Sequence, residues 1–341
     1  MKFDRKKVKK ILVIKPAAIG DVLLCTPVVE NLRIDFPDAE IIFLTQKYCK
    51  EALTGNPNIN RILTYDLALD SGWCLIRNIR KQKYDLVIDL FGNPRTALIT
   101  LFSGARYKTG YKFNWRSIAY NIKVKPRGGE VHNVEFNLDS LRALGLTTIK
   151  NKPLFFINNI HRKFAADFFR TAGLKGKEVI GINPCGTWPT KVWTKEKFIE
   201  LGKLLSPKYH ILLFWGNENE KLLAESIKTS IGNNAGIIPE IDIKYMGALL
   251  EKCKVFVTND TGPMHISWIL GVPTAAIFGP TNPDLQGPLL ENSVIIRNES
   301  LTCLGCNLTK LEDCPNEHKC MNELGVEYVI SKINGLINKP V

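Results

Sequence analysis

The sequence lacks any long hydrophobic run, and no stretch approaches the ~18 apolar residues that a membrane-spanning helix needs. Met1–Lys10 holds six Lys or Arg, but the apolar run that follows covers only Ile11–Ile14, which is too short for a secretory signal. Internal repeats and low-complexity segments are missing as well, which argues against repeat and disordered classes. We therefore expect a globular cytoplasmic protein.

The usual phosphate-binding motifs are also missing. Neither Gly-x-Gly-x-x-Gly nor Gly-x4-Gly-Lys-Ser/Thr occurs, which excludes the dinucleotide fingerprint and the P-loop. There is no Asp-x-Asp pair, the simplest carboxylate clamp for a divalent metal on a nucleotide diphosphate. If the chain binds a diphosphate, side-chain cations and backbone N–H groups must supply the positive potential.

Cysteine is present in an odd number, nine, and is unevenly spaced. Five cysteines stand singly in apolar or helical contexts, as reduced buried thiols do in the cytoplasm. The others form one cluster with His318: Cys303, Cys306, Cys314 and Cys320. These residue types permit zinc, but their spacing matches no standard finger or ribbon. Reduced structural thiols or a disulfide are the favoured interpretations.

Negative charge is scarce in the first half of the chain. Residues 1–150 carry 25 Lys/Arg and 14 Asp/Glu, a net +11, whereas residues 151–341 carry 21 and 19, a net +2. Nearly all of the overall +13 therefore belongs to the first half. This half is built to meet an anionic partner.

Short apolar runs alternate with helical patterns along the whole chain. The predicted strands of the first half are Ile11–Lys15, Glu40–Thr45, Arg61–Tyr65, Asp85–Leu90 and Arg106–Tyr111. Those of the second half are Glu178–Asn183, His210–Trp215, Gly236–Ile238, Val255–Thr258 and Pro273–Phe278. Such alternation predicts parallel sheets with helices on both faces.

We predict two α/β domains, residues 1–150 and 151–341, joined by the turn-rich linker Leu146–Pro153. Ligands of such folds bind at the carboxyl ends of the strands, so a cleft shared by the two domains is expected. The segment Glu323–Ile337 is predicted to be a helix, and its position at the end of the chain allows it to pack back on the first domain.

The stretch Thr258–His265 has the form of an anion site. A predicted strand enters a turn and then a helix, so free N–H groups and the positive helix end meet at one point. Thr261 and His265 add a hydroxyl and an imidazole. With Gly262 at the helix end, Lys191 and the Thr187 hydroxyl complete a set sufficient for a diphosphate without metal. The alternative interpretation is an ordinary capped helix after a buried strand.

Taken in order, these motifs resemble glycosyltransferase family 9, the ADP-heptose:lipopolysaccharide heptosyltransferases. The resemblance covers about residues 10–340 and rests on these segments: Ile19-Gly20-Asp21, Lys191 within Trp188–Trp193, Glu220 after Trp215-Gly216, Asp260-Thr261-Gly262-Pro263-Met264-His265, and Phe278-Gly279-Pro280-Thr281. It implies the GT-B fold, in which two Rossmann-like doubly wound domains face a cleft. It also implies metal-independent, inverting transfer from an ADP-sugar bound to the second domain.

The resemblance also implies roles for single residues. Asp21 matches the general base, which takes the proton of the acceptor hydroxyl. The donor-binding residues that it implies are Lys191, Glu220, Asp260, Thr261, Gly262 and His265. Asp260 is an odd neighbour for a diphosphate, and we expect it to fix the loop or cap the helix rather than touch the ligand. Glu218 lies two residues before Glu220, so either glutamate is a candidate for this role.

Basic and aromatic residues interleave in the first domain. Between Arg95 and Arg127 there are eight basic residues and no acids. Such a stretch suits nucleic acid, a solvated loop or an anionic glycolipid. The family context favours the glycolipid, with Arg95, Lys108, Lys112 and Arg116 as acceptor-binding candidates and no nucleic-acid partner. We expect the basic run Met1–Lys10 either to be a frayed tail or to bind anionic lipid weakly at the inner face of the inner membrane.

The sequence thus predicts a cytoplasmic glycosyltransferase that moves a heptose-type sugar from ADP to a lipopolysaccharide-core acceptor without cofactor or metal. A nucleotide-sugar isomerase of the same fold is the enzymatic alternative. A non-catalytic protein that binds nucleotide or sugar is the other. The sugar itself depends on a few pocket contacts worth only ~1–3 kcal/mol each, which a single sequence does not reveal.

Overall fold

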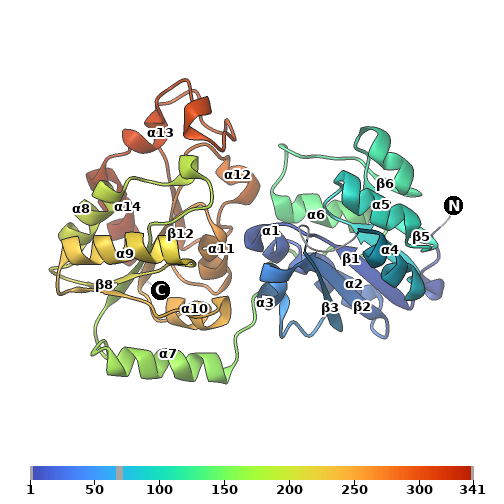
Figure 1. Cartoon of the computed structure of the whole chain (residues 1–341), viewed down its shortest axis with the longest axis horizontal. Coiled ribbons are helices and arrows are strands. Elements are labelled where there is room, and N and C mark those ends of the chain that lie inside the picture. Colours follow the sequence, from blue (N-terminus) through green and yellow to red (C-terminus); the bar gives the residue numbers. More distant parts are fainter. Residues whose placement is uncertain (1–2, 67–71, 339–341) are drawn as a thin grey trace. The chain divides into compact units, whose positions relative to one another are not determined.

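The computed structural model describes residues 3–66 and 72–338. The chain divides into two units, Met1–Phe156 and Ile157–Val341, and each contains one six-stranded sheet with flanking helices (Figure 1). All paired neighbours in both sheets are parallel. The predicted α/β class with two doubly wound domains is confirmed.

The first sheet has the order β3-β2-β1-β4-β5-β6. Its strands are β1 Lys10–Ile14, β2 Glu40–Gln46, β3 Arg61–Tyr65, β4 Leu86–Asp89, β5 Tyr107–Tyr111 and β6 Ile122–Val124. The helices are α1 Ile19–Leu23, α2 Thr26–Asp35, α3 Lys50–Leu53, α4 Gly72–Lys81, α5 Pro94–Phe102 and α6 Asn133–Arg142, with the 3₁₀ turns η1 Arg5–Lys7, η2 Lys47–Cys49 and η3 Asn114–Ala119.

The second sheet has the order β12-β11-β10-β7-β8-β9, which is the same topology. Its strands are β7 Val179–Asn183, β8 His210–Leu213, β9 Ala235–Ile237, β10 Val255–Asn259, β11 Thr274–Ile277 and β12 Ser293–Ile296. The helices are α7 Asn159–Thr171, α8 Lys195–Leu205, α9 Glu218–Ile231, α10 Ile243–Leu250, α11 Gly262–Ile269, α12 Pro283–Gln286, α13 Lys319–Asn322 and α14 Val326–Ile337, with η4 Pro189–Lys191 and η5 Leu311–Asp313. Strands β6 and β12 were not predicted; they are short outer strands with partly exposed residues.

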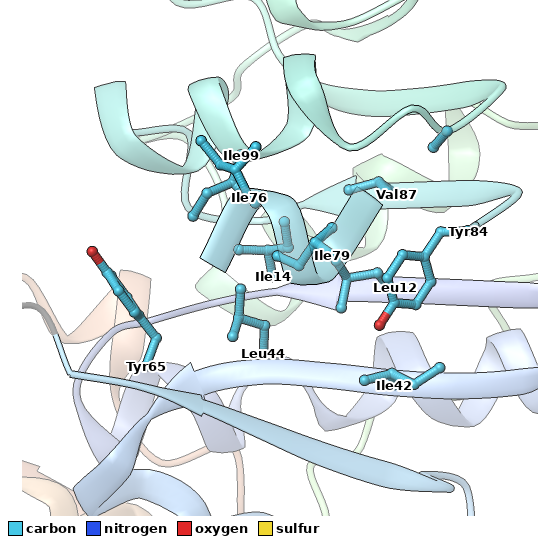
Figure 2. Packing of buried hydrophobic residues seen from close by; sticks show 11 residues of the cluster. Leu12, Ile14, Ile42, Leu44, Tyr65, Ile76, Ile79, Tyr84, Val87 and Ile99 are labelled. Carbon is cyan, nitrogen blue, oxygen red and sulfur yellow. The ribbon is translucent and has the colours of Figure 1, made fainter. Parts of the chain in front are cut away.

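Both faces of the first sheet are buried, which is why its strands are nearly continuous apolar runs. Figure 2 shows one face, where Ile76 and Ile79 of α4 lie over Leu12 and Ile14 of β1. The alternate residues of β1 are equally buried because helices cover the other face as well. The charged side chains of α4, Arg77, Arg80 and Lys81, are exposed, whereas Ile76 and Ile79 are buried, so its amphipathic pattern fixes its orientation.

The segment predicted as a linker packs on the first unit. The Thr147 N–H donates to Asp35 at 2.6 Å, and the Leu154 N–H donates to the Thr26 hydroxyl oxygen at 2.7 Å. The buried side chain of Asn31 donates to the Lys150 carbonyl at 2.7 Å. Helix α2 thus holds this stretch, which explains why the first unit extends to Phe156 rather than ending near residue 150.

The terminal helix α14 packs within the second unit, against β10, β11, β12 and α8. Its buried stripe consists of Val326, Val329, Ile333 and Leu336. The apolar face of α14 is therefore buried against the second sheet. Within residues 3–66 and 72–338, no helix has the length and apolar character needed to cross a membrane.

Gly110 and Tyr120 shape the carboxyl end of β4. A Cβ atom at Gly110 would lie 2.4 Å from the Tyr120 ring, so only glycine permits the ring to lie on β5. The Tyr120 hydroxyl donates to the buried Asp89 carboxylate at 2.7 Å. Asp89 also accepts N–H groups from Phe91 at 3.0 Å and Gly92 at 2.9 Å, which fixes the loop after β4.

We expect Gly110→Ala to destabilise the first unit by about 1–3 kcal/mol, because the added methyl group must displace a rigid aromatic ring. Urea unfolding followed by circular dichroism measures this cost. Gly128→Ala is the matched control in the same unit, since its Cβ would meet Phe136 at an ordinary 3.8 Å. Equal unfolding midpoints for the two variants would contradict the packing argument.

Candidate active site

The second unit brings its polar residues together where β7 and β10 lie side by side. Asn183 pairs in register with Thr258, and the loops that follow leave from the same edge of the sheet. Strand order reverses between these two strands, and ligands of doubly wound sheets bind at such a switch point. The buried Asn183 amide donates to the hydroxyls of Thr258 at 3.3 Å and Thr261 at 3.1 Å.

Asn259 holds the loop that follows β7. Its amide donates to the Cys185 carbonyl at 3.1 Å, and its side-chain oxygen accepts the Trp193 N–H at 3.1 Å. The loop between these two contacts contains Thr187 and Lys191. Thr187 is exposed on this loop, whereas Lys191 is turned inward.

Asp260 is the centre of the site. One of its carboxylate oxygens, Oδ2, accepts from Lys191 Nζ at 2.6 Å, from the Thr281 hydroxyl at 2.7 Å and from the Gln286 amide at 2.7 Å. The side chains of Asp260 and Lys191 are only 3% and 14% exposed. One carboxylate thus joins the loops after β7, β10 and β11, as expected of a residue that fixes the loop.

Lys191 is consequently not an independent cation. Its ammonium is paired with Asp260 and lies 4.3 Å from the centre of the Trp188 ring, so its direction is set before any ligand arrives. An ammonium has three N–H donors, and two remain beyond the Asp260 contact. Lys191 was predicted to lie at a diphosphate, but its pairing with Asp260 was not predicted. Gln286 carried no sequence signal at all.

Helix α11 begins at this same edge. Thr261 is its N-cap residue, but the Thr261 side chain makes no capping hydrogen bond to the first turn. Gly262 and Pro263 start the helix, and proline has no N–H of its own to satisfy. The N-terminal N–H groups and the helix dipole therefore favour an anion here. His265 stands in the first turn and is buried in this structure.

Glu220 and Glu218 have different surroundings. The Glu220 carboxylate accepts the Gly216 N–H at 2.7 Å, so it folds back onto the loop after β8. Glu218 is exposed and pairs with Lys221 at 3.6 Å. Burial raises the pKa of the Cys185 thiol, and the nearby Glu220 adds to the rise, which puts Glu220 beside the loop after β7.

A hollow of about 570 Å³ opens beside Glu220, at the carboxyl ends of β8 and β9. It is lined by Trp215, Gly216, Asn217, Glu218, Glu240, Ile241 and Asp242. The Trp215 indole N–H donates to the Ile238 carbonyl at 2.8 Å, which holds its ring in place. Carboxylates and a partly aromatic wall suit a ligand with several hydroxyl groups.

The cysteine-rich segment, residues 303–320, forms hydrogen bonds with the loops of the site. The Thr190 hydroxyl donates to the Leu308 carbonyl at 2.6 Å, and His318 Nε2 lies 2.6 Å from the Thr190 carbonyl oxygen. The Asn307 N–H donates to the Pro280 carbonyl at 2.7 Å. The segment thus braces the loops that carry Lys191 and Thr281. The sequence showed the cysteines but not this role.

The four clustered thiols are unpaired in the structure. Burial raises the pKa of Cys320 to about 11, and Cys306, Cys303 and Cys314 add to the rise, so the four sulfurs lie near one another. Across the described residues, however, no three or more His, Cys, Asp or Glu side chains are arranged to hold a metal ion. Cys320 packs against Gly279, where an added Cβ would lie 3.0 Å from the Cys320 sulfur.

In the first unit, Asp21 is the third residue of the short helix α1 and is partly exposed. Two buried thiols lie near it. Burial raises the pKa of Cys49 to about 12 and that of Cys25 to about 12, and the Asp21 charge adds to both. These thiols therefore stay protonated at neutral pH.

The loop after β1 is tied to the loop after β4, at the switch point of the first sheet. Lys15 Nζ donates to the Leu90 carbonyl at 3.1 Å, and β1 pairs with β4 up to Asp89. Burial raises the pKa of Asp89 above its usual range. Asp89 therefore fixes the loop after β4 through its hydrogen bonds, whereas Asp21 is accessible to solvent.

The four basic acceptor candidates do not form one group. Lys108 is the second residue of β5 and Lys112 follows its last, so about 13 Å of strand separates them. The Arg116 guanidinium donates to the Gly92 carbonyl at 2.7 Å, near the start of α5, which carries the exposed Arg95. Lys112 is exposed at the carboxyl edge, where ligands bind. Lys108 lies near the opposite end of its strand and does not join the others.

We expect Asp260→Asn to destabilise the second unit by about 3–5 kcal/mol, because it leaves the mostly buried Lys191 without its carboxylate. Thermal unfolding measures the change. Glu299→Gln is the control, since it breaks the more exposed Arg297 pair at 2.7 Å and is expected to cost at most about 1 kcal/mol. Similar small losses in both variants would show that the Asp260 pair does not hold the loops.

Known proteins resemble this arrangement over almost its whole length. The model of glycosyltransferase family 9 (heptosyltransferase) matches residues 73–314. Lipopolysaccharide heptosyltransferase 2 of Escherichia coli K12 is 25% identical over 350 residues, covering 96% of this chain and 98% of its own length. Lipooligosaccharide heptosyltransferase 2 of Haemophilus ducreyi is 22% identical over 351 residues, covering 96% and 99%.

A solved structure shows the same fold. The glycosyl transferase family 9 protein from Veillonella parvula superposes with a TM-score of 0.83 at 23% identity, covering 96% of this chain and 97% of its own. Together with the family match, this confirms the GT-B class that the resemblance implied. The chain belongs to glycosyltransferase family 9 (heptosyltransferase) and is a glycosyltransferase.

Proposed function

We propose that this enzyme transfers a heptose-type sugar from an ADP-sugar to a lipopolysaccharide-core acceptor, with inversion at the anomeric carbon. The observation that carries the proposal is the preoriented Lys191–Asp260 pair beside the uncapped start of α11, in a chain of a heptosyltransferase family. Relatives named lipooligosaccharide heptosyltransferase 2 and lipopolysaccharide heptosyltransferase 2 support the choice of sugar and acceptor.

The donor diphosphate binds at the start of α11 in this proposal. Backbone N–H groups of its first turn, the Thr261 hydroxyl and the two remaining N–H donors of Lys191 contact the phosphate oxygens. Asp260 does not touch the diphosphate but aims Lys191 at it. Because cationic and N–H donors converge here, we infer that transfer needs no divalent metal and continues in the presence of a chelator.

The nucleoside occupies the hollow at the ends of β8 and β9. Ribose hydroxyls are donors, and the Glu220 carboxylate next to the Gly216 loop is a suitable acceptor for them. The Glu218 side chain remains at the outer rim, since it pairs with Lys221. Thr187 lies on the exposed side of the loop between β7 and α8 and contributes a hydroxyl to the donor.

Asp21 acts as the general base. As the acceptor oxygen forms its bond to the anomeric carbon, the bond from that carbon to the diphosphate oxygen breaks, and the electron pair leaves with ADP. The acceptor hydroxyl proton passes to the Asp21 carboxylate. Attack from the side opposite to the leaving ADP gives inversion. The positive potential at α11 and Lys191 stabilises the leaving phosphate.

The acceptor binds through the first unit. Arg95, Lys112 and Arg116 provide cations for its anionic groups, and Lys108 is not part of this set. Such an acceptor is a glycolipid, so we propose that the enzyme works in the cytoplasm at the inner face of the inner membrane.

We expect Thr261→Val and His265→Ala to weaken ADP binding at least about tenfold, because each removes a polar group from the phosphate site. Isothermal titration calorimetry measures the dissociation constant directly. Thr229→Val is the control, since its hydroxyl bonds only within α9 at 2.9 Å to the Glu225 carbonyl. Unchanged ADP affinity in the first two variants would remove α11 from the donor site.

We expect Asp21→Asn to lower kcat by about 10²–10⁴ while ADP affinity stays within about twofold of wild type, because only the proton acceptor is lost. Steady-state kinetics and calorimetry on the same preparation separate the two effects. Asp38→Asn, an exposed carboxylate of the same unit, is the matched control. Near-normal turnover with donor still bound would exclude Asp21 from the chemistry.

A further inference from the structure

The outer layer of the first unit exposes an unusual set of apolar side chains. Trp73 of α4, Leu98 of α5, and Trp115 and Ile118 of η3 are 68%, 42%, 62% and 75% exposed. Helix α5 packs against both α4 and η3, so the three elements form one continuous layer. Single exposed apolar residues need no explanation, but a group of four that includes two tryptophans marks an interaction surface.

The charges of this layer have one sign. Every charged side chain on α4, α5 and η3 is Arg or Lys. Residues 72–121 contain nine Lys/Arg and two acids, Asp85 and Asp89. Asp89 is fully buried, and the Asp85 carboxylate accepts the N–H groups of Lys9 and Lys10, both at 2.9 Å. The exposed apolar side chains are therefore flanked by positive charge.

The apolar character continues below the surface. A hollow of about 300 Å³ lies between α4 and α5, and its walls include Trp73, Ile76, Leu98 and Ile99, with Arg95 at the same opening. The Trp73 ring lies 5.9 Å from that of Phe102, which supports it from the side. A partner that meets this surface thus encounters aromatic rings, a shallow apolar recess and guanidinium groups together.

We propose that the α4–α5–η3 layer is the surface by which the protein lies on an anionic phospholipid bilayer. Tryptophan favours the boundary between headgroups and acyl chains, where its ring is apolar and its N–H remains hydrated. Arg and Lys at the same depth pair with lipid phosphates, and neither contribution alone gives stable attachment. The inference deepens the proposed work at a membrane but does not depend on the transfer chemistry.

Co-sedimentation of the full chain with vesicles tests this surface. Wild type is expected to sediment with vesicles of equal parts phosphatidylglycerol and phosphatidylcholine, and to remain in solution with phosphatidylcholine alone. The double variant Trp115→Ser/Ile118→Ser is expected to bind the anionic vesicles about tenfold more weakly, because two apolar anchors are lost. Leu204→Ser/Leu222→Ser is the matched control in the second unit, where both leucines are similarly exposed.

A second pair of variants tests how much the positive charges of this layer contribute to vesicle binding. Arg77→Ala/Arg80→Ala is expected to weaken vesicle binding and to reduce its dependence on salt, whereas Lys203→Ala/Lys228→Ala, which loses the same charge from the second unit, is expected to match wild type within about twofold. Equal thermal midpoints show that the variants are folded. Quenching of tryptophan fluorescence by brominated phosphatidylglycerol, reduced in Trp73→Phe and Trp115→Phe, supports direct insertion.

Three results would overturn the proposal. Wild type that stays in solution with anionic vesicles excludes the bilayer as partner. Equal losses in Leu204→Ser/Leu222→Ser and Trp115→Ser/Ile118→Ser exclude the α4–α5–η3 layer as the binding surface. Binding of a single-stranded oligonucleotide that is lost in the Trp115→Ser/Ile118→Ser variant, without vesicle binding, assigns the surface to nucleic acid. Loss of transfer in Asp21→Asn with normal vesicle binding leaves this inference intact, so its failure and that of the proposed function are distinguishable.

Discussion

The buried pair of Asp260 and Lys191 is the interaction on which the second unit's site depends. Bringing a carboxylate and an ammonium out of water is costly, and the cost is offset only when the remaining polar atoms find partners. Here the Thr281 hydroxyl and the Gln286 amide meet the same carboxylate oxygen. Three loops from three strands are therefore held at one point. The start of α11 at Gly262 lies two residues after Asp260, so its position is fixed by the same contacts.

The two units share one strand order but place different polar residues at the point where that order reverses. In each sheet the loops after the first and fourth strands meet where the strand order reverses. In the second unit this edge gathers Asn183, Asn259 and Asp260, whose hydrogen bonds hold the loops after β7, β10 and β11 together. In the first unit Asp89 takes the buried structural role, and the nearby Asp21 remains accessible to solvent. In the first unit the buried supporting carboxylate and the solvent-accessible one are therefore different residues.

Much of the fold was predictable because alternating apolar and amphipathic runs determine a parallel sheet with little ambiguity. The strands β6 and β12 were missed because they are short and partly exposed, so their residues carry no clear pattern. The Asp260–Lys191 pair joins residues far apart in the sequence, and no local signal reveals it. The same holds for Thr190 and His318, whose contact gives the cysteine-rich segment a supporting role. Lys108 was grouped with Lys112 because they are close in the sequence, but they lie near opposite ends of β5.

The measurement that tests the central claim most directly is acceptor-dependent release of ADP. The enzyme is incubated with ADP-heptose, with and without a truncated lipopolysaccharide core, and both ADP and the mass of the core are followed. ADP is expected to appear only when the core is present, in step with a mass increase of one heptosyl residue. ADP or free sugar formed at the same rate without acceptor would contradict transfer and favour a nucleotide-sugar isomerase or hydrolase. Tight ADP binding without turnover under either condition would instead indicate a non-catalytic binding protein.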